Sequence, residues 1–176
     1  MPLFLTISGS LRAASSNTAA LEALALLAPA TVTVRRYDEL DQLPAFNPDL
    51  EGGDPPDSVA RLRALIGQAD AIVISSPEYA RGIAGALKNM LDWLVGAVEF
   101  PNKPVALITT SQRAEYAPEQ LRLVLTTMSA RVVESASIML PLLGRPLTAA
   151  EIAADGELCG QLRAAIEALT EAVGVA

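Results

Sequence analysis

The sequence predicts an α/β fold in which a parallel, doubly wound sheet lies between two layers of helices. Short apolar or β-branched runs, which are typical of strands, alternate along the 176 residues with longer segments of helical periodicity. The central runs are continuously apolar, which indicates strands that are covered on both faces. Because the crossovers between parallel strands are right-handed, helices are expected on both sides of the sheet.

The alternation comprises five expected strands and five expected helices. The strands are expected at residues 3–8, 31–37, 71–75, 105–110 and 132–139. The helices are expected at residues 18–28, 57–68, 84–98, 118–130 and 158–173. Thr148 and Glu151 have the spacing of a capping box and predict one further helical turn. No repeat or linker divides the chain, so residues 1–176 are expected to form a single domain.

The composition argues against several classes of function. Asp and Glu total 20 against 13 Lys and Arg, and the formal charge of -7 repels nucleic acids and anionic membrane surfaces. No apolar run approaches the ~20 residues of a spanning helix, and the N-terminus carries no signal-peptide pattern, so a cytoplasmic protein is expected. The chain has no histidine, which removes histidine-dependent catalytic triads and zinc sites.

Cys159 is the one cysteine of the chain. It allows no internal disulfide, no cysteine pair for zinc and no C-x-x-C redox pair. A small buried side chain is the favoured interpretation of Cys159, ahead of a redox sensor. Any redox chemistry of this protein must therefore come from a bound cofactor.

The loop after the first expected strand has the composition of an anion site. Ser10, Arg12, Ser15 and Asn17 lie between a strand and the start of a helix, where free N–H groups and the helix dipole favour an anion. Hydroxyl groups and a guanidinium can bind a phosphomonoester there. The alternative is that a serine or Asn17 only caps the helix and that Arg12 is solvated. The loop matches neither a Walker A motif nor the G-x-G-x-x-G fingerprint of dinucleotide sites.

Two motifs together indicate a family. The first is Gly9-Ser10-Leu11-Arg12 with Ser15 and Asn17, and the second is Pro77-Glu78-Tyr79 followed by Gly85 to Asn89, Asp92 and Trp93. In residues and spacing they resemble the NADPH-dependent FMN reductase family, which includes quinone, azo and chromate reductases. The resemblance implies a flavodoxin-like fold whose five parallel strands have the order 2-1-3-4-5.

The resemblance also implies roles for individual residues. Ser10, Arg12, Ser15 and Asn17 would hold the phosphate of FMN, and Pro77, Glu78, Tyr79 and Ala80 would lie along the isoalloxazine edge. Ser111, after the fourth strand, is the remaining candidate for cofactor binding. NADPH or NADH would reduce the flavin and leave, and a small-molecule electron acceptor would take its place. Hydride transfer of this kind requires the substrates to be oriented over the flavin and needs no acid or base side chain, so no catalytic side chain and no metal ligand is assigned.

The chain departs from the family pattern in two loops. Ala80, Gly82 and Ala84 stand where the family usually has Asn, Ser and Pro. The loop of residues 111–118 contains no glycine, so its backbone lacks easy access to positive φ and to close contact with the ring. Tyr116 could stack on the flavin and Arg113 could meet a nicotinamide phosphate, with solvent exposure favoured for Arg113.

The next helix carries residues whose roles the sequence leaves open. Trp93 falls off the apolar stripe of this helix, so it belongs either to the core or, with Val98 and Phe100, to a dimer contact. Lys88 and Asn89 are expected to be helix surface or capping residues. Family members are commonly dimers or tetramers, which implies a homo-oligomer.

Three functional hypotheses follow. The first is an enzyme that passes hydride equivalents from NAD(P)H through FMN to a quinone, an azo compound, free flavin or a metal oxyanion. The second is an FMN-binding electron-transfer protein that does not oxidise NAD(P)H efficiently. The third is a flavin-free domain that serves as an interaction module.

Overall fold

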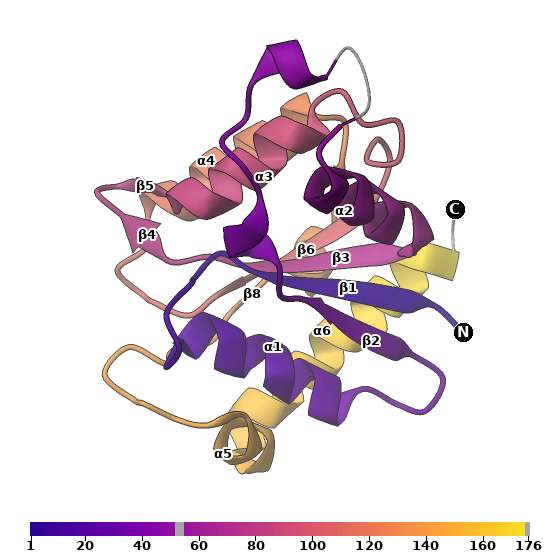
Figure 1. The fold of residues 1–176 in the computed structure, drawn as a ribbon. Helices are drawn as coiled ribbons and strands as arrows, with labels where there is room; N and C mark the ends of the chain where they lie inside the picture. The colour runs from indigo at the N-terminus through magenta and orange to yellow at the C-terminus, as the bar shows by residue number, and fades with distance from the viewer. Residues whose placement is uncertain (52–54, 175–176) are drawn as a thin grey trace.

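The computed structural model describes residues 1–51 and 55–174, which form a parallel sheet with helices on both faces (Figure 1). The strands of this sheet are β1 (Leu3–Ser8), β2 (Thr33–Tyr37), β3 (Ala71–Ser75), β6 (Pro104–Thr109), β7 (Arg131–Val132) and β8 (Ile138–Met139). The helices are α1 (Ser16–Leu27), α2 (Asp57–Gln68), α3 (Gly85–Leu94), α4 (Tyr116–Thr127), α5 (Ala149–Ala154) and α6 (Gly156–Gly174). A separate hairpin consists of β4 (Glu78–Tyr79) and β5 (Gly82–Ile83).

The strand order confirms the predicted topology. The main sheet has the order β2-β1-β3-β6, and both β7 and β8 pair with β6 in parallel. Counted as one interrupted fifth strand, β7 and β8 complete the flavodoxin-like order 2-1-3-4-5. The first connection thus leads to one edge of the sheet and the later ones to the other, so the loops after β1 and β3 flank the point where the strand order reverses.

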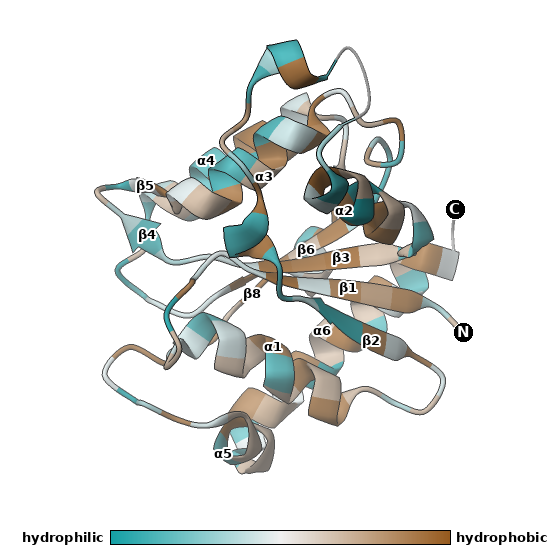
Figure 2. Ribbon diagram, in the orientation of Figure 1, coloured by the Kyte–Doolittle hydropathy of each residue, from teal (hydrophilic) through white to brown (hydrophobic). Residues whose placement is uncertain are grey.

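Alternate strand residues pack into two separate cores, one on each face of the sheet. Leu5 and Ile74 point toward α2, α3 and α4, whereas Phe4 and Val73 point toward α1, α5 and α6. The central strands β1 and β3 therefore appear almost continuously hydrophobic in Figure 2, whereas the edge strand β2 has a hydrophilic stretch. Half-buried Cys159 packs against the second core, in keeping with a structural role.

The prediction of one continuous fifth strand is wrong. A single 3-10 turn, Glu134–Ala136, separates β7 from β8. The Ser137 hydroxyl stabilises the interruption, because it accepts a hydrogen bond from Leu107 N–H (3.1 Å) and donates one to the carbonyl of Val133 (3.0 Å). A side chain thus replaces the missing strand partner of Leu107, which an apolar run cannot reveal.

The observed helix boundaries agree with the predicted ones at some ends and differ from them at others. α2 has the predicted bounds, and the capping box of Thr148 and Glu151 starts α5. α1 begins two residues before the expected start, because Ser15 is the N-cap and its hydroxyl accepts from Thr18 N–H (3.4 Å). α3 ends at Leu94, short of the expected Val98.

Trp93 belongs to the core, which decides the alternative left open by the sequence. Its side chain is 0% exposed, its ring meets Phe46 edge to face at 5.1 Å, and its indole N–H donates to the carbonyl of Pro44 (2.8 Å). Asn89 holds the same segment through hydrogen bonds with Pro44 and Phe46, so it is neither a free surface residue nor a cap. Phe100 is also buried, so it does not offer a dimer contact.

The protein is expected to lose stability at high pH because of Tyr37, a buried residue at the end of β2. Burial, assisted by the negative charge of Glu39, raises the pKa of Tyr37 from 10.0 to about 12. Between these values the unfolded chain has released the phenolic proton and the native chain has kept it, so the free energy of unfolding falls as pH rises. The expected slope is about 1.4 kcal/mol per pH unit. In Tyr37→Phe this contribution to the pH dependence of stability should be absent. Urea unfolding of both proteins at pH 9 to 12 measures it. If the free energy of unfolding falls equally with pH in both, the raised pKa of Tyr37 is contradicted.

Candidate functional site

The site lies at the edge of the sheet where the parallel strands reach their carboxyl ends. Asn17, in the first turn of α1, contacts the ends of two strands there. Its side-chain oxygen lies 2.9 Å from the hydroxyl of Ser75, which ends β3, and 3.2 Å from that of Thr110, which follows β6. The Ser75 hydroxyl also lies 2.8 Å from the carbonyl of Ile108. Asn17 is therefore held by buried hydroxyl groups, and the start of α1 is fixed against the sheet.

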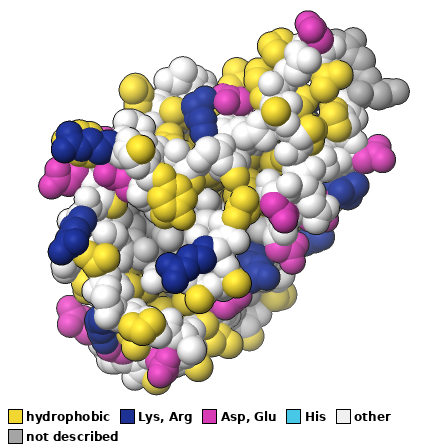
Figure 3. Space-filling view, turned by 60° about the vertical axis from the view of Figure 1, so that its left-hand side comes forward, with side chains coloured by type: hydrophobic (Ala, Val, Ile, Leu, Met, Phe, Trp, Pro, Cys, Tyr) yellow, Lys and Arg dark blue, Asp and Glu magenta, His cyan; other side chains and the backbone are white. Residues whose placement is uncertain are grey.

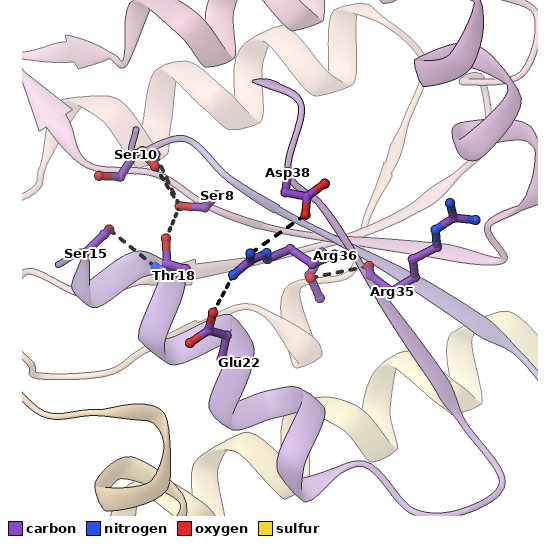
Figure 4. A network of polar contacts seen from close by, with 9 residues as sticks. Ser8, Ser10, Ser15, Thr18, Glu22, Arg35, Arg36 and Asp38 are labelled. Carbon is purple, nitrogen blue, oxygen red and sulfur yellow. Dashed lines mark hydrogen bonds and ion pairs between the residues drawn. The ribbon is translucent and has the colours of Figure 1, made fainter. Parts of the chain in front are cut away.

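The loop between β1 and α1 is held by hydroxyl groups of its own ends. Thr18 donates from its hydroxyl to that of Ser8 (2.9 Å), and Ser10 N–H donates to the same oxygen (3.3 Å), as Figure 4 shows. Ser15 also contributes by capping α1. Sequence reasoning missed Ser8, Thr18, Ser75 and Thr110 as positioning residues. The signal was present, because hydroxyl side chains stand at the ends of successive strands.

The start of α1 has the properties of an anion site. Its first turn contains no acidic residue, and among the described residues the N–H groups of Ser16 and Asn17 have no acceptor. Arg12 is exposed, and no carboxylate of the described part of the chain lies within ion-pair distance of it. A phosphate would satisfy the N–H groups, the helix dipole and the guanidinium together, so these residues fit the phosphate of a flavin nucleotide.

A cleft of about 740 Å³ opens beside this loop. Its walls are the loop itself, the end of β2 with the residues after it, and the segment that leads into α5. Ser10, Arg12 and Ser15 line the cleft, whereas Pro77 to Ala80 and Ser111 do not. The structure thus brings three of the predicted phosphate residues to one cavity and places the predicted ring-edge residues outside it.

The predicted ring-edge residues form the β4–β5 hairpin. Ala80 and Arg81 occupy its turn with φ values of 50° and 60°. This left-handed backbone conformation is unfavourable for residues other than Gly, Asn or Asp. Tyr79 is 56% exposed, so its ring is available to a ligand or to solvent. Pro77 and Glu78 are half-buried.

The hairpin is bound to the glycine-free loop that follows β6. The Glu78 carboxylate accepts hydrogen bonds from the N–H groups of Tyr116 (2.8 Å) and Ala117 (2.9 Å), and so caps α4 from outside the helix. The Arg81 guanidinium lies 4.9 Å from the centre of the Tyr116 ring, and Gln120 donates to the Arg81 carbonyl (3.0 Å). Side-chain contacts, and not glycine backbone, thus hold together the wall formed by the hairpin and the loop after β6. Figure 3 views this side of the molecule and shows basic and hydrophobic side chains interspersed.

The remaining candidates of the same loop adopt local structure. The Ser111 hydroxyl accepts from Arg113 N–H (3.2 Å) and so stabilises the turn after β6. The Arg113 residue is exposed, as expected for a solvated charge. Lys88, on α3, pairs with Asp92 one turn away.

Within the described residues, no helix is long and apolar enough to cross a membrane, and no group of acidic, histidine or cysteine side chains is placed to hold a metal.

Replacing Glu78 by alanine is expected to destabilise the protein by about 0.5–2 kcal/mol, the usual contribution of an N-terminal cap. The N–H groups of Tyr116 and Ala117 lose their acceptor, and the hairpin loses its connection to α4. Urea unfolding measures the loss, and Glu78→Gln, which keeps one acceptor oxygen, should recover part of it. Stability equal to that of the parent in Glu78→Ala contradicts the capping role.

The fold defines a class of protein: a flavodoxin-like α/β domain, here with a polar loop at the carboxyl edge of its sheet that fits an anion. The chain belongs to the NADPH-dependent FMN reductase family, whose model matches residues 2–142, and this confirms the family predicted from its motifs. That family is named for FMN and NADPH.

Individual relatives are consistent with this family. The chain is 38% identical over 109 residues to the "NAD(P)H-dependent FMN reductase PA1204" of Pseudomonas aeruginosa, a match that covers 61% of this chain and 58% of the relative. It is 33% identical over 143 residues to a "Quinone reductase" of Escherichia coli, with 76% and 74% covered. Among solved structures, the flavoenzyme FerB of Paracoccus denitrificans, an NAD(P)H:(acceptor) oxidoreductase, superimposes with a TM-score of 0.81, 27% identity and coverage of 99% and 98%. The chain thus spans less than two thirds of the Pseudomonas aeruginosa relative.

Proposed function

We propose that this chain holds FMN at the carboxyl edge of its sheet and passes hydride equivalents from NADPH or NADH to a small-molecule acceptor. Quinones, azo compounds, free flavins and metal oxyanions are the acceptors considered. The observation that carries the proposal is the start of α1 in a chain of net charge -7. Within the described ranges 1–51 and 55–174, the N–H groups of Ser16 and Asn17 have no acceptor and Arg12 has no carboxylate partner, so all three can bind an anion. Membership of the reductase family supports the same function.

The phosphate is assigned to the loop between β1 and α1. The Arg12 guanidinium would bind two phosphate oxygens, and the Ser10 and Ser15 hydroxyls would donate to others. The backbone N–H groups of Ser16 and Asn17 would complete the site. The Asn17 side-chain oxygen already lies close to the hydroxyls of Ser75 and Thr110, so its part would be to fix the loop and to offer its amide nitrogen.

The ring edge is assigned to the hairpin and to the turn at Ser111. When bound, FMN supplies the group that accepts and donates hydride. Pro77, Glu78, Tyr79 and Ala80 would set the plane of the ring, with backbone N–H groups near its polar edge. The Glu78 cap and the Arg81–Tyr116 contact hold this wall in one position, so both substrates would meet the same ring face.

The decisive measurement is anaerobic mixing of the flavin-loaded protein with NADPH and with NADH. We expect the yellow flavin band to bleach with at least one donor and to return when a quinone is added. If neither donor bleaches the flavin, the hypothesis of a reductase is contradicted. The hypothesis of an FMN-binding electron-transfer protein then remains, and the glycine-free loop of residues 111–118 favours it. A colourless protein that does not rebind FMN contradicts both of these hypotheses.

We further propose that the protein is cytoplasmic and forms a homodimer or homotetramer. Val95 and Val98, just after α3, are 66% and 87% exposed, and such side chains support a contact between copies. Light scattering during gel filtration measures the mass, and a monomer at micromolar concentration contradicts the oligomer.

A further inference from the structure

The cleft beside the phosphate loop extends away from the predicted ring site. It begins at the loop of Ser10 to Ser15, but the hairpin and Ser111 take no part in its walls. Instead it runs between the end of β2 and the segment of residues 142–149. About 740 Å³ is within the usual range of small-molecule sites. The phosphate of a flavin nucleotide occupies little of this volume, and the flavin ring is assigned elsewhere.

One acidic residue of the cleft has the position in the fold that binds ribose in nucleotide sites. In βαβ dinucleotide sites, the phosphates lie at the helix start, and an acid at the end of the second strand accepts hydrogen bonds from the adenosine ribose. Asp38 directly follows β2 and lines this cleft. Its side chain is 69% exposed, and its one ion-pair contact with a described residue is Arg36, at 3.9 Å. Its carboxylate oxygens are thus free to accept hydrogen bonds from ribose.

The apolar lining offers room for a base. Tyr37 and Leu40 contribute from the end of β2, and Leu142, Pro146 and Leu147 contribute from the segment before α5. A planar purine can pack between apolar side chains of this kind.

The basic residues of the cleft differ in their availability. Arg36 pairs with Glu22, as Figure 4 shows, and Arg145 pairs with Asp155 at 2.9 Å. Arg12 alone among these basic residues has no carboxylate partner within the described part of the chain. Its guanidinium carries five N–H donors, so the group assigned to the flavin phosphate has donors left for a second phosphate joined to the first.

We propose that the cleft binds an adenosine 5′-phosphate group, namely the adenylate half of FAD, with its ribose on Asp38. The inference rests on the proposed flavin phosphate site, because the adenylate of FAD is bonded to that same phosphate. The loop assigned to the flavin phosphate also lines the cleft, so a single ligand bound through that phosphate can occupy the ring site and the cleft together. The protein then accepts FMN and binds FAD more tightly.

Calorimetric titration of the flavin-free, full-length chain with FMN and with FAD tests this inference. We expect FAD to bind about 10-fold more tightly or better, as for one or two additional hydrogen bonds to a charged group. Asp38→Ala should lower the affinity for FAD about 10-fold and leave FMN binding unchanged. Asp49→Ala, at an exposed acid outside the cleft, is the matched control and should keep the preference. Circular dichroism confirms that each variant is folded.

The possible outcomes separate this inference from the proposed function. Equal affinities for FMN and FAD, or a preference that Asp38→Ala does not change, overturn the adenylate site and leave the FMN site in place. Binding of 5′-AMP to the FMN-loaded protein, with no preference for FAD, overturns the assignment to FAD and indicates a separate adenine nucleotide. Failure to bind either flavin overturns both proposals.

Discussion

Arg12→Ala is expected to weaken the binding of FMN about 10- to 100-fold, which corresponds to the loss of a charged hydrogen bond to its anion. Arg12 is the guanidinium nearest in sequence to the start of α1, and no described carboxylate pairs with it. Its removal leaves the phosphate with the N–H groups and the serine hydroxyls alone. Titration of flavin-free protein with FMN measures the change.

Two controls make the result specific. Arg163→Ala removes an exposed arginine of α6 whose contact is the sulfur of Cys159, and it should leave FMN affinity unchanged. Arg12→Lys keeps the charge without the bidentate geometry and should recover part of the affinity. If Arg12→Ala binds FMN as tightly as the parent, the phosphate is held elsewhere.

Trp93→Ala is expected to lower the free energy of unfolding by about 3–5 kcal/mol, the usual cost of deleting a large buried aromatic side chain. Trp93 is fully buried, packs edge to face on Phe46 and donates to the carbonyl of Pro44. Its loss leaves a cavity and removes one of the two donors to the Pro44 carbonyl, the other being the Asn89 side chain. Urea unfolding at constant protein concentration measures the change.

Trp93→Phe distinguishes the two contributions, since it keeps most of the apolar volume and removes only the indole donor. It should lose less than half as much stability as the alanine variant. Leu123→Ala, at a side chain of α4 that is 69% exposed, should change stability by no more than ~0.5 kcal/mol. A loss below about 1 kcal/mol in Trp93→Ala, together with a change in molecular mass, would contradict the core assignment.

The site illustrates how far sequence patterns reach. The polar loop after β1 predicted an anion site because hydroxyls and an arginine are local to one helix start. The role of Glu78 as a cap was not predictable, because the cap and the N–H groups of Tyr116 and Ala117 lie far apart in the sequence. The same contact explains why α4 begins two residues before the expected start: the acceptor comes from the hairpin, and the sequence just before the helix supplies none.

The cleft is a product of the tertiary structure. Asp38 and Leu147 face one cavity because α1 and α5 pack together on the same side of the sheet. Neither residue formed part of a motif. Sequence reasoning recognised the loop at one end of the cleft and gave no sign of the space beyond it.

The sequence by itself determined the alternation of parallel strands and helices, the bounds of β1, β3 and α2, and the family, but not the β4–β5 hairpin. These features depend on periodicity, caps and short motifs, whose interactions lie within a few residues. The tertiary structure decided the interrupted fifth strand, the burial of Trp93, the wall built by Glu78 and Arg81, and the cleft at Asp38. Each of these depends on partners distant in the chain, which meet only when both faces of the sheet are packed.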